Sequence, residues 1–384
     1  MLDELRRRAA PGGRWGLPTV GLAVLLLFGY VGTHRYPVED PRAAAAPTPQ
    51  ETFGDGLPRV TGTRGAGPAG LRLLVSGAVP QVLDAHTGRS GPVPGLRLGR
   101  YEAARLQLVP GGLVATIGTA TTVGPRSVLL ATAGGRPVQL GTDVRVTPAR
   151  RGGELYVSSY GPGGTSVLVT ARSGQVRAYW AQPGLVTPQQ DTAAGLLVAR
   201  SDSAGTSGAD LALVDPSTGE LRRALAAGRI AIAVGPAAVA HIPADCGRDC
   251  PLTVTRLADG SSRDYRTPDA GAPSRGAFSP DGRWLALGVP GQYLNGRLTI
   301  RPGFAAVLDL AGGGTVRVPG VETPAERTAD LSWWGPDRLV LGVWWDDRGE
   351  VALWSVRRPA EPLQVLEVEP AGSYAYSSVT ALPP

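Results

Sequence analysis

The stretch VLDLAGGGTVRV (Val307–Val318) places two short apolar runs on either side of a glycine-rich turn. Six other stretches also place two apolar runs on either side of a tight turn, and all but the last of them, a degenerate copy, have a glycine in that turn. They are VLDAHTGRSGPV (Val82–Val93), LLATAGGRPVQL (Leu129–Leu140), LVTARSGQVRAY (Leu168–Tyr179), ALVDPSTGELRRAL (Ala212–Leu225), VTRLADGSSRDY (Val254–Tyr265) and ALWSVRRPAEPLQV (Ala352–Val365). The period is roughly 40 to 53 residues, and strand-type repeats of that length are typical of a β-propeller, whose blades are four-stranded antiparallel sheets.

A second repeat, out of phase with the first, has a proline between two apolar strands. Its prolines are Pro110, Pro148, Pro188, Pro236, Pro280 and Pro336. Proline fixes φ near −65°, which suits the second position of a type I turn, as in Ser279-Pro280-Asp281-Gly282. Each unit is therefore predicted to contain strand a, a proline turn, strand b, strand c, a glycine turn and strand d.

The two repeats differ in number, because the prolines mark six units and the hairpins seven. The C-terminal Val379–Pro383 has the pattern of a strand followed by proline, and Leu71–Val75 resembles a strand b with no strand a before it. We therefore predict an all-β, seven-bladed propeller over residues 71–384 that is closed by the C-terminal strand. Glu220–Ala227 is predicted to be a strand d rather than a helix. Closure would remove the open sheet edges that favour aggregation.

The N-terminus predicts a membrane anchor. Trp15–Thr33 contains 19 residues without a charge, which is long enough for a transmembrane helix over 15–33. Four arginines precede it, so residues 1–14 are predicted to form a basic cytoplasmic arm. The protein would then be a single-pass plasma-membrane protein with an extracytoplasmic propeller. The alternative is a cleaved signal peptide, with a small-residue site at Ala43–Ala45.

Between the span and the propeller, residues 34–70 are rich in proline, alanine and glycine and have no periodicity. They are predicted to form a tether.

Cys246 and Cys250 are the two cysteines of the chain. Outside the cell, an even number of cysteines favours a disulfide, here one that closes a small loop between strands b and c of the fifth blade. Free thiols and half of a metal site are the alternatives, although the C-x3-C spacing has no second pair to complete a metal site.

Few residue patterns in the sequence fit catalytic chemistry. The sequence has no G-x-S-x-G motif and only three histidines, His34, His86 and His241. This makes a Ser-His-Asp triad or a multi-histidine metal centre improbable, and we expect no cofactor. Asp346 and Asp347 follow two tryptophans and form either a solvated hairpin tip or a carboxylate pair for metal or glycoside chemistry. Residues 1–35 contribute half of the net charge of +6, and the basic residues of the rest of the chain are dispersed, so no nucleic-acid partner is expected.

One stretch carries a family resemblance. AFSPDGRWLA (Ala277–Ala286) resembles the signature of the TolB-like, WD40-like propeller repeat through Phe278, Ser279, Pro280, Asp281, Gly282 and Trp284. Degenerate copies occur at Trp334–Leu339 and Val109–Val114. WD40 repeats end strand c in Trp-Asp, whereas the Trp345-Asp346 dipeptide here follows strand b, so the TolB-like assignment is preferred.

The resemblance implies a non-catalytic platform that binds a protein or a cell-envelope polymer. The anchor and the absence of lysine resemble actinobacterial membrane-anchored propellers, some of which act beside sigma factors. The alternatives are an extracytoplasmic enzyme of lactonase or glycosidase type and an envelope signalling partner of a sigma-factor system. The expected ligand surface carries the loops Pro290–Pro302, Ala204–Gly208 and Asp346–Glu350, with Tyr293, Asp346 and Asp347 as candidate contacts.

Overall fold

The computed structural model contains two compact units, Met1–Leu57 and Pro58–Pro384. It describes residues 60–110, 112–119, 126–132, 137–150, 153–171, 173–201, 208–246, 250–267, 271–294, 299–324, 327–344, 349–368 and 377–383. All of these lie in the second unit. The expected arm (1–14), the expected membrane helix (15–33) and most of the expected tether lie outside the described residues. Within the described residues, no helix is long and apolar enough to span a bilayer.

The described residues form β-sheets and no α-helix. Four of the sheets have four antiparallel strands each. In sheet order these are β30 (Ser378–Ala381), β2 (Arg72–Ser76), β3 (Gln81–Asp84) and β4 (Ser90–Pro92); β5 (Glu102–Val109), β6 (Gly112–Thr119), β7 (Ser127–Thr132) and β8 (Val138–Thr142); β12 (Val176–Gln182), β11 (Gly164–Ala171), β10 (Glu154–Gly161) and β9 (Arg145–Pro148); and β20 (Arg275–Phe278), β21 (Trp284–Val289), β24 (Phe304–Asp309) and β25 (Thr315–Arg317).

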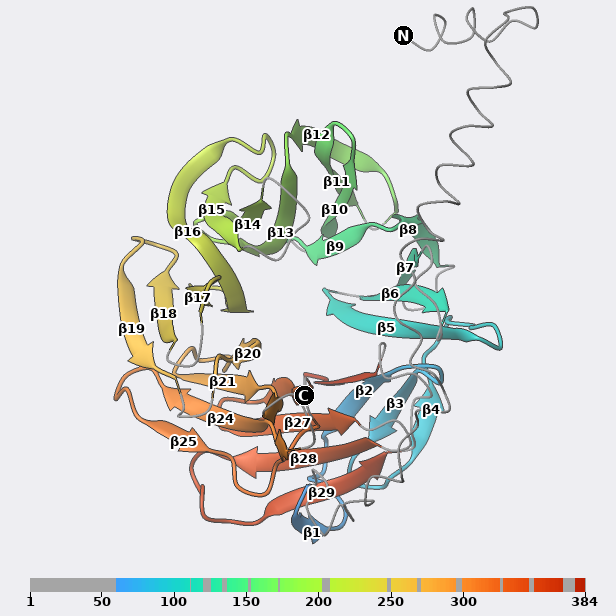
Figure 1. Cartoon of the computed structure of the whole chain (residues 1–384). Coiled ribbons are helices and arrows are strands. Elements are labelled where there is room, and N and C mark those ends of the chain that lie inside the picture. The colour runs from blue at the N-terminus through green and yellow to red at the C-terminus, as the bar shows by residue number, and fades with distance from the viewer. Residues whose placement is uncertain are drawn as a thin grey trace, which may run out of the picture. The chain divides into compact units, whose positions relative to one another are not determined.

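Three other sheets complete the described part of the unit. A five-stranded sheet contains β1 (Gly62–Arg64), β29 (Leu363–Val368), β28 (Gly349–Ser355), β27 (Arg338–Trp344) and β26 (Asp330–Trp334), and a two-stranded sheet contains β22 (Gln292–Leu294) and β23 (Thr299–Arg301). A seven-stranded sheet contains β13 (Leu185–Thr192), β14 (Gly195–Ser201), β15 (Ala209–Val214), β16 (Leu221–Val234), β17 (Ala238–Pro243), β18 (Pro251–Arg256) and β19 (Ser262–Arg266). Figure 1 shows the sheets of this unit following one another around a common centre, which is the arrangement of a β-propeller.

The seven-stranded sheet arises because β16 is long enough to pair with two different strands, β15 and β17. Its first half pairs with β15, from Leu221 opposite Val214, and its second half pairs with β17, up to Val234 opposite Val239. The sheet therefore consists of two sets of four strands, β13 to β16 and β16 to β19, which share β16. The strand predicted for Glu220–Ala227 is confirmed from Leu221 onward, but it continues without a break into the next unit.

The C-terminal strand of the described chain joins the sheet formed by the strands β2, β3 and β4. β30 pairs antiparallel with β2, with Ala381 opposite Leu73 and Ser378 opposite Ser76. This is the pairing expected from the isolated strand pattern at the C-terminus. Val379 and Ala381 are buried in a cluster with Leu73 and Val340, so the first and last sheets also share an apolar interface.

The predicted boundary between the tether and the propeller, at residue 70, lies too far along the chain. Val60–Gly67 belongs to the folded unit, because β1 adds a parallel strand to the edge of β29 and Val60 is buried in the neighbouring core. A Cβ atom at Gly62 would lie 2.4 Å from the Leu363 carbonyl oxygen, so only glycine allows this approach. The three residues of β1 are exposed and pair with β29 through the backbone, and Arg64 also forms an ion pair with Glu350 (2.7 Å). None of these contacts leaves a hydrophobic pattern in the sequence.

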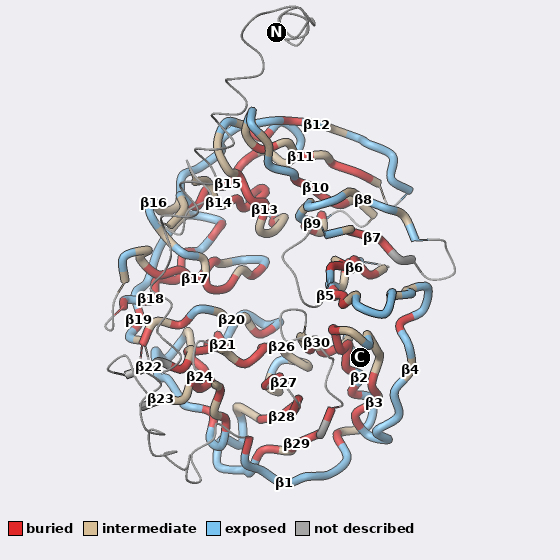
Figure 2. Tube along the Cα trace, turned by 45° about the vertical axis from the view of Figure 1, so that its right-hand side comes forward, coloured by how far each residue is buried: buried red, intermediate tan, exposed pale blue. Residues whose placement is uncertain are grey.

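The apolar clusters lie between neighbouring sheets. One of them joins Ala286 and Val307 of one sheet to Leu339 and Leu341 of the next. Figure 2 shows the corresponding gradient across the sheets, with edge strands such as β1 and β4 largely exposed and middle strands largely buried.

The proline pattern is confirmed in part. Pro110, Pro236, Pro280 and Pro336 lie between strands, as expected. Pro148 ends β9, whereas Pro188 lies within β13 next to a register shift, so its predicted place in a turn is wrong. The physical reason is that β13 is the first strand of its sheet, and an edge strand or a bulge tolerates a residue without an N–H group.

Removing residues 377–384 from the full-length protein should lower the free energy of unfolding by well over the roughly 1 kcal/mol of a typical substitution. The deletion removes β30 and exposes the apolar cluster shared by the first and last sheets. Urea denaturation followed by tryptophan fluorescence measures the change, with Pro383→Ala as the control at an exposed site. Equal midpoints for the deletion and the parent would contradict this role of β30.

Candidate functional site

The family-motif residues form the turn between β20 and β21. Ser279 Oγ donates a hydrogen bond to Asp281 Oδ1 (2.6 Å) and accepts one from the Trp284 backbone N–H (2.9 Å). The Ser279 hydrogen bond lowers the pKa of Asp281, which keeps this carboxylate ionised as the acceptor of the turn. Gly282 has a φ of 70°, a conformation that favours glycine.

Phe278 and Trp284 anchor the two sides of this turn. Phe278 packs against the core beside Leu285, and Trp284 packs against the next core beside Leu339. Together with Pro280, the motif therefore shapes a corner and fixes the spacing of neighbouring sheets. Its contacts are those of a structural turn.

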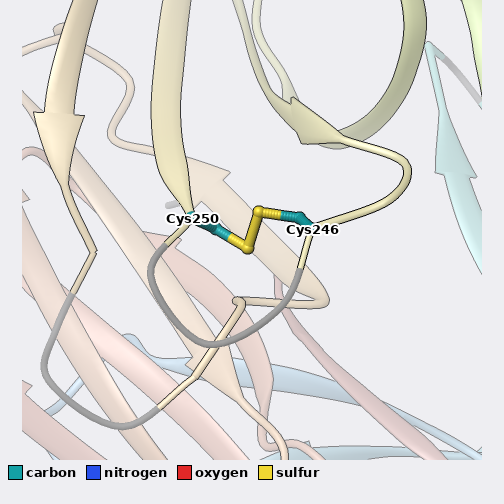
Figure 3. The surroundings of a disulfide bond; sticks show 2 residues. All are labelled: Cys246 and Cys250. Carbon is teal, nitrogen blue, oxygen red and sulfur yellow. A yellow bond between two sulfur atoms is a disulfide. The ribbon is translucent and has the colours of Figure 1, made fainter.

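The predicted disulfide is present. Cys246 and Cys250 are bonded, with their Cα atoms 5.5 Å apart, in the connection between β17 and β18 (Figure 3). Cys250 is 2% exposed and belongs to the core between two sheets. The bond thus attaches this connection to the core, where the sequence placed it.

The predicted ligand surface is represented only in part. Tyr293 lies in β22, opposite Ile300 of β23. Asp346 and Asp347 lie outside the described residues. In the described part of the chain, no group of three or more His, Cys, Asp and Glu side chains is placed to hold a metal ion.

The strand register reveals a different set of residues, on the innermost strands. Arg105, Arg145, Arg275 and Asp330 pair with Thr116, Ser158, Gly288 and Gly342, respectively. Each of these pairing partners lies three residues after the first leucine of the second strand in its sheet. Arg105, Arg145, Arg275 and Asp330 therefore lie at the same level on the innermost strands of four different sheets. Figure 2 shows β5, β9, β20 and β26 around the centre of the unit.

One of these residues is buried and paired. Asp330 is 6% exposed, forms an ion pair with Arg275 of the preceding sheet and accepts a hydrogen bond from Trp344 Nε1 (2.7 Å). Burial raises the pKa of Asp330, against the opposing effect of Arg275. This contact joins two neighbouring sheets at their inner strands.

Two of the arginines keep free hydrogen-bonding capacity. Arg105 and Arg145 are exposed, and in the described part of the chain neither forms an ion pair with a carboxylate. Arg145 donates only a long hydrogen bond to Thr187 Oγ1 (3.4 Å). A guanidinium group has five N–H donors, so these side chains can bind an anion.

Thr187 also lines a pocket of about 360 Å³. This pocket lies between β13 and the second half of β16, and its wall includes a third arginine, Arg229. Arg145 and Arg229 therefore stand at the pocket, one through its contact with Thr187 and the other as part of its wall.

A buried histidine lies on β17 beside this region. His241 is 1% exposed and pairs in register with Ala231, a pocket residue. Its Nε2 atom is 2.9 Å from Thr255 Oγ1, and its Nδ1 atom has no hydrogen-bond partner among the described residues. Burial, with the nearby Arg229, lowers the pKa of His241 to about 4. No motif in the sequence assigns His241 a role, and its burial on β17 is seen only in the folded structure.

No family model matches the chain, and no curated protein is similar to it in sequence.

Solved structures are similar in fold. Hydrazine synthase of Kuenenia stuttgartiensis has a TM-score of 0.52 and 14% identity, covering 77% of this chain and 99% of that one. TolB of Acinetobacter baumannii has a TM-score of 0.49 and 13% identity over 83% and 68% of the two chains. A putative TolB of Agrobacterium tumefaciens has a TM-score of 0.40 and 12% identity over 65% and 95%. At 14% identity the likeness to the hydrazine synthase chain concerns the fold alone.

The free energy of unfolding should depend on pH through His241. Its folded pKa of about 4 lies below the ordinary value of 6.5, so between these values the unfolded state binds more protons and stability falls as the pH falls. The full loss is on the order of 3 kcal/mol, at about 1.4 kcal/mol per pKa unit. The replacement His241→Gln should remove this part of the slope in urea titrations between pH 7 and 4. The same slope in both proteins would show that His241 is not the cause.

Proposed function

We propose that this protein is a single-pass membrane protein that presents a seven-bladed β-propeller outside the cell as a non-catalytic binding module. Its partner in this proposal is a protein of the cell envelope. The observation that carries the binding role is the set of arginines at one level of the inner strands. Arg105 and Arg145 are exposed there and pair with no carboxylate in the described part of the chain.

The strand order supports the blade count. The four four-stranded sheets supply one blade each, the sheet from β26 to β29 supplies another, and the seven-stranded sheet supplies two that share β16. This division gives seven blades, with β30 as the inner strand of the first. The small pair β22 and β23 extends from the connection between β21 and β24.

The uncharged stretch Trp15–Thr33, with four arginines before it, supports the anchor and its orientation. An extracytoplasmic address also fits the Cys246–Cys250 disulfide, because thiols oxidise outside the cytoplasm.

The topology is tested with single added cysteines in intact cells. A cysteine at Ala45 should react with a membrane-impermeant maleimide, whereas one at Ala9 should react only after the cells are permeabilised. The native pair is bonded and should not react. Labelling at Ala9 but not at Ala45 would reverse the proposed orientation.

The binding role is tested by photo-crosslinking in living cells. A benzophenone amino acid at Gln107, exposed on the inner strand β5, should yield a discrete higher-mass adduct with a partner protein. The matched control is the same amino acid at Val316, which is 45% exposed on the edge strand β25. Adducts from Val316 alone, or from neither position, would count against binding at the inner strands.

A further inference from the structure

The pocket between β13 and β16 combines an apolar wall with a cationic rim. Its apolar residues include Leu185, Ala199, Ile230 and Ala231. Ile230 is 38% exposed, which is unusual for an isoleucine on an inner strand. An apolar ligand group that covered Ile230 would be favoured by the hydrophobic effect.

The polar part of the pocket is positively charged. Arg229 lines it, Arg145 reaches its rim through Thr187 Oγ1, and no described carboxylate lines its wall. Thr187, Gln189 and Ser201 add neutral hydrogen-bonding groups. The site therefore favours a ligand with a carboxylate beside an aliphatic group, since guanidinium and carboxylate form paired hydrogen bonds.

The walls of the pocket are held in place by close backbone contacts. The Gly228 N–H donates to Asp210 Oδ1 (3.0 Å), and the Ala244 N–H donates to the Gly228 carbonyl (3.0 Å). A Cβ atom at Gly208, a pocket residue, would lie 2.4 Å from the Ala244 Cβ. Backbone hydrogen bonds thus attach the wall that carries Arg229 to the neighbouring strands.

We propose that this pocket binds an acidic peptide segment of the partner protein, with a carboxylate between Arg145 and Arg229 and an aliphatic side chain against Ile230. The inference rests on the proposed binding function and specifies its ligand. A volume of about 360 Å³ fits one or two side chains, and the pocket opens to solvent, so that a chain can pass across it. An extended peptide with alternating acidic and aliphatic residues meets both requirements.

The test measures fluorescence anisotropy of a short fluorescein-labelled peptide in which glutamate alternates with leucine, titrated with the purified full-length protein. Saturable binding is expected. It should weaken about tenfold or more in Arg145→Gln and in Arg229→Gln, because each change removes a charge-assisted hydrogen bond. The matched control Arg177→Gln alters an exposed arginine on β12 that does not line this pocket and should leave the affinity unchanged.

Two control peptides separate the parts of the site. Replacing glutamate by glutamine should abolish binding, and replacing leucine by serine should weaken it, as should Ile230→Ser in the protein. Equal melting temperatures of the variants show that the fold is retained. No saturable binding, an equal loss in Arg177→Gln, or displacement of the peptide by inorganic polyphosphate as effectively as by unlabelled peptide would overturn the proposal.

The outcome is distinguishable from that of the proposed function. If Gln107 crosslinks a partner in cells but the peptide does not bind, the binding role stands and this pocket is not its site. If the peptide binds and Gln107 yields no adduct, the pocket stands and the proposed contact of the partner with the inner strand β5 is wrong.

Discussion

The backbone pairing between β30 and β2 is the contact on which the rest of the unit depends. It places the last strand of the chain beside one of the first and buries Val379 and Ala381 between the first and last sheets. The Val379 backbone also interacts with the buried carboxylate of Asp330. The ion pair between Asp330 and Arg275, which joins two other sheets, is therefore formed in a site that β30 helps to enclose. Loss of this strand would expose a carboxylate as well as an apolar surface.

The features predicted correctly from the sequence are those with local causes. The hairpin glycines were recognisable because their turns need a left-handed residue, as at Gly88 (φ 68°) and Gly219 (φ 74°). The same turns are stabilised by side chains nearby in sequence, as Asp84 Oδ1 shows by accepting from the His86 and Thr87 N–H groups. The disulfide is also local, because only three residues separate its cysteines. Such signals need no knowledge of the tertiary structure.

The features that were missed depend on contacts between distant segments. β1 has no apolar pattern because it binds through its backbone. The shared level of the arginines cannot be predicted from the sequence repeat, because the distance from each arginine to the next proline varies from three residues for Arg145 to five for Arg105. Only the pairing with the second strand places them at one level, and a shift of one residue would turn each side chain to the opposite face. The pocket is still harder to predict from the sequence, because two of its residues, Thr187 and Arg229, are 42 positions apart.

The shared strand β16 has a consequence for how a ligand could influence the unit. In a propeller whose blades are joined by loops, neighbouring sheets can tilt against one another about the connection. Here one continuous strand, Leu221 to Val234, forms hydrogen bonds to β15 with its first part and to β17 with its second part. Both pairings contain register shifts, and Gly228 beside Arg229 has a left-handed φ of 59°. A ligand bound at Arg229 would therefore act on the one strand that the two sheets share, at the point where its pairing passes from one sheet to the other.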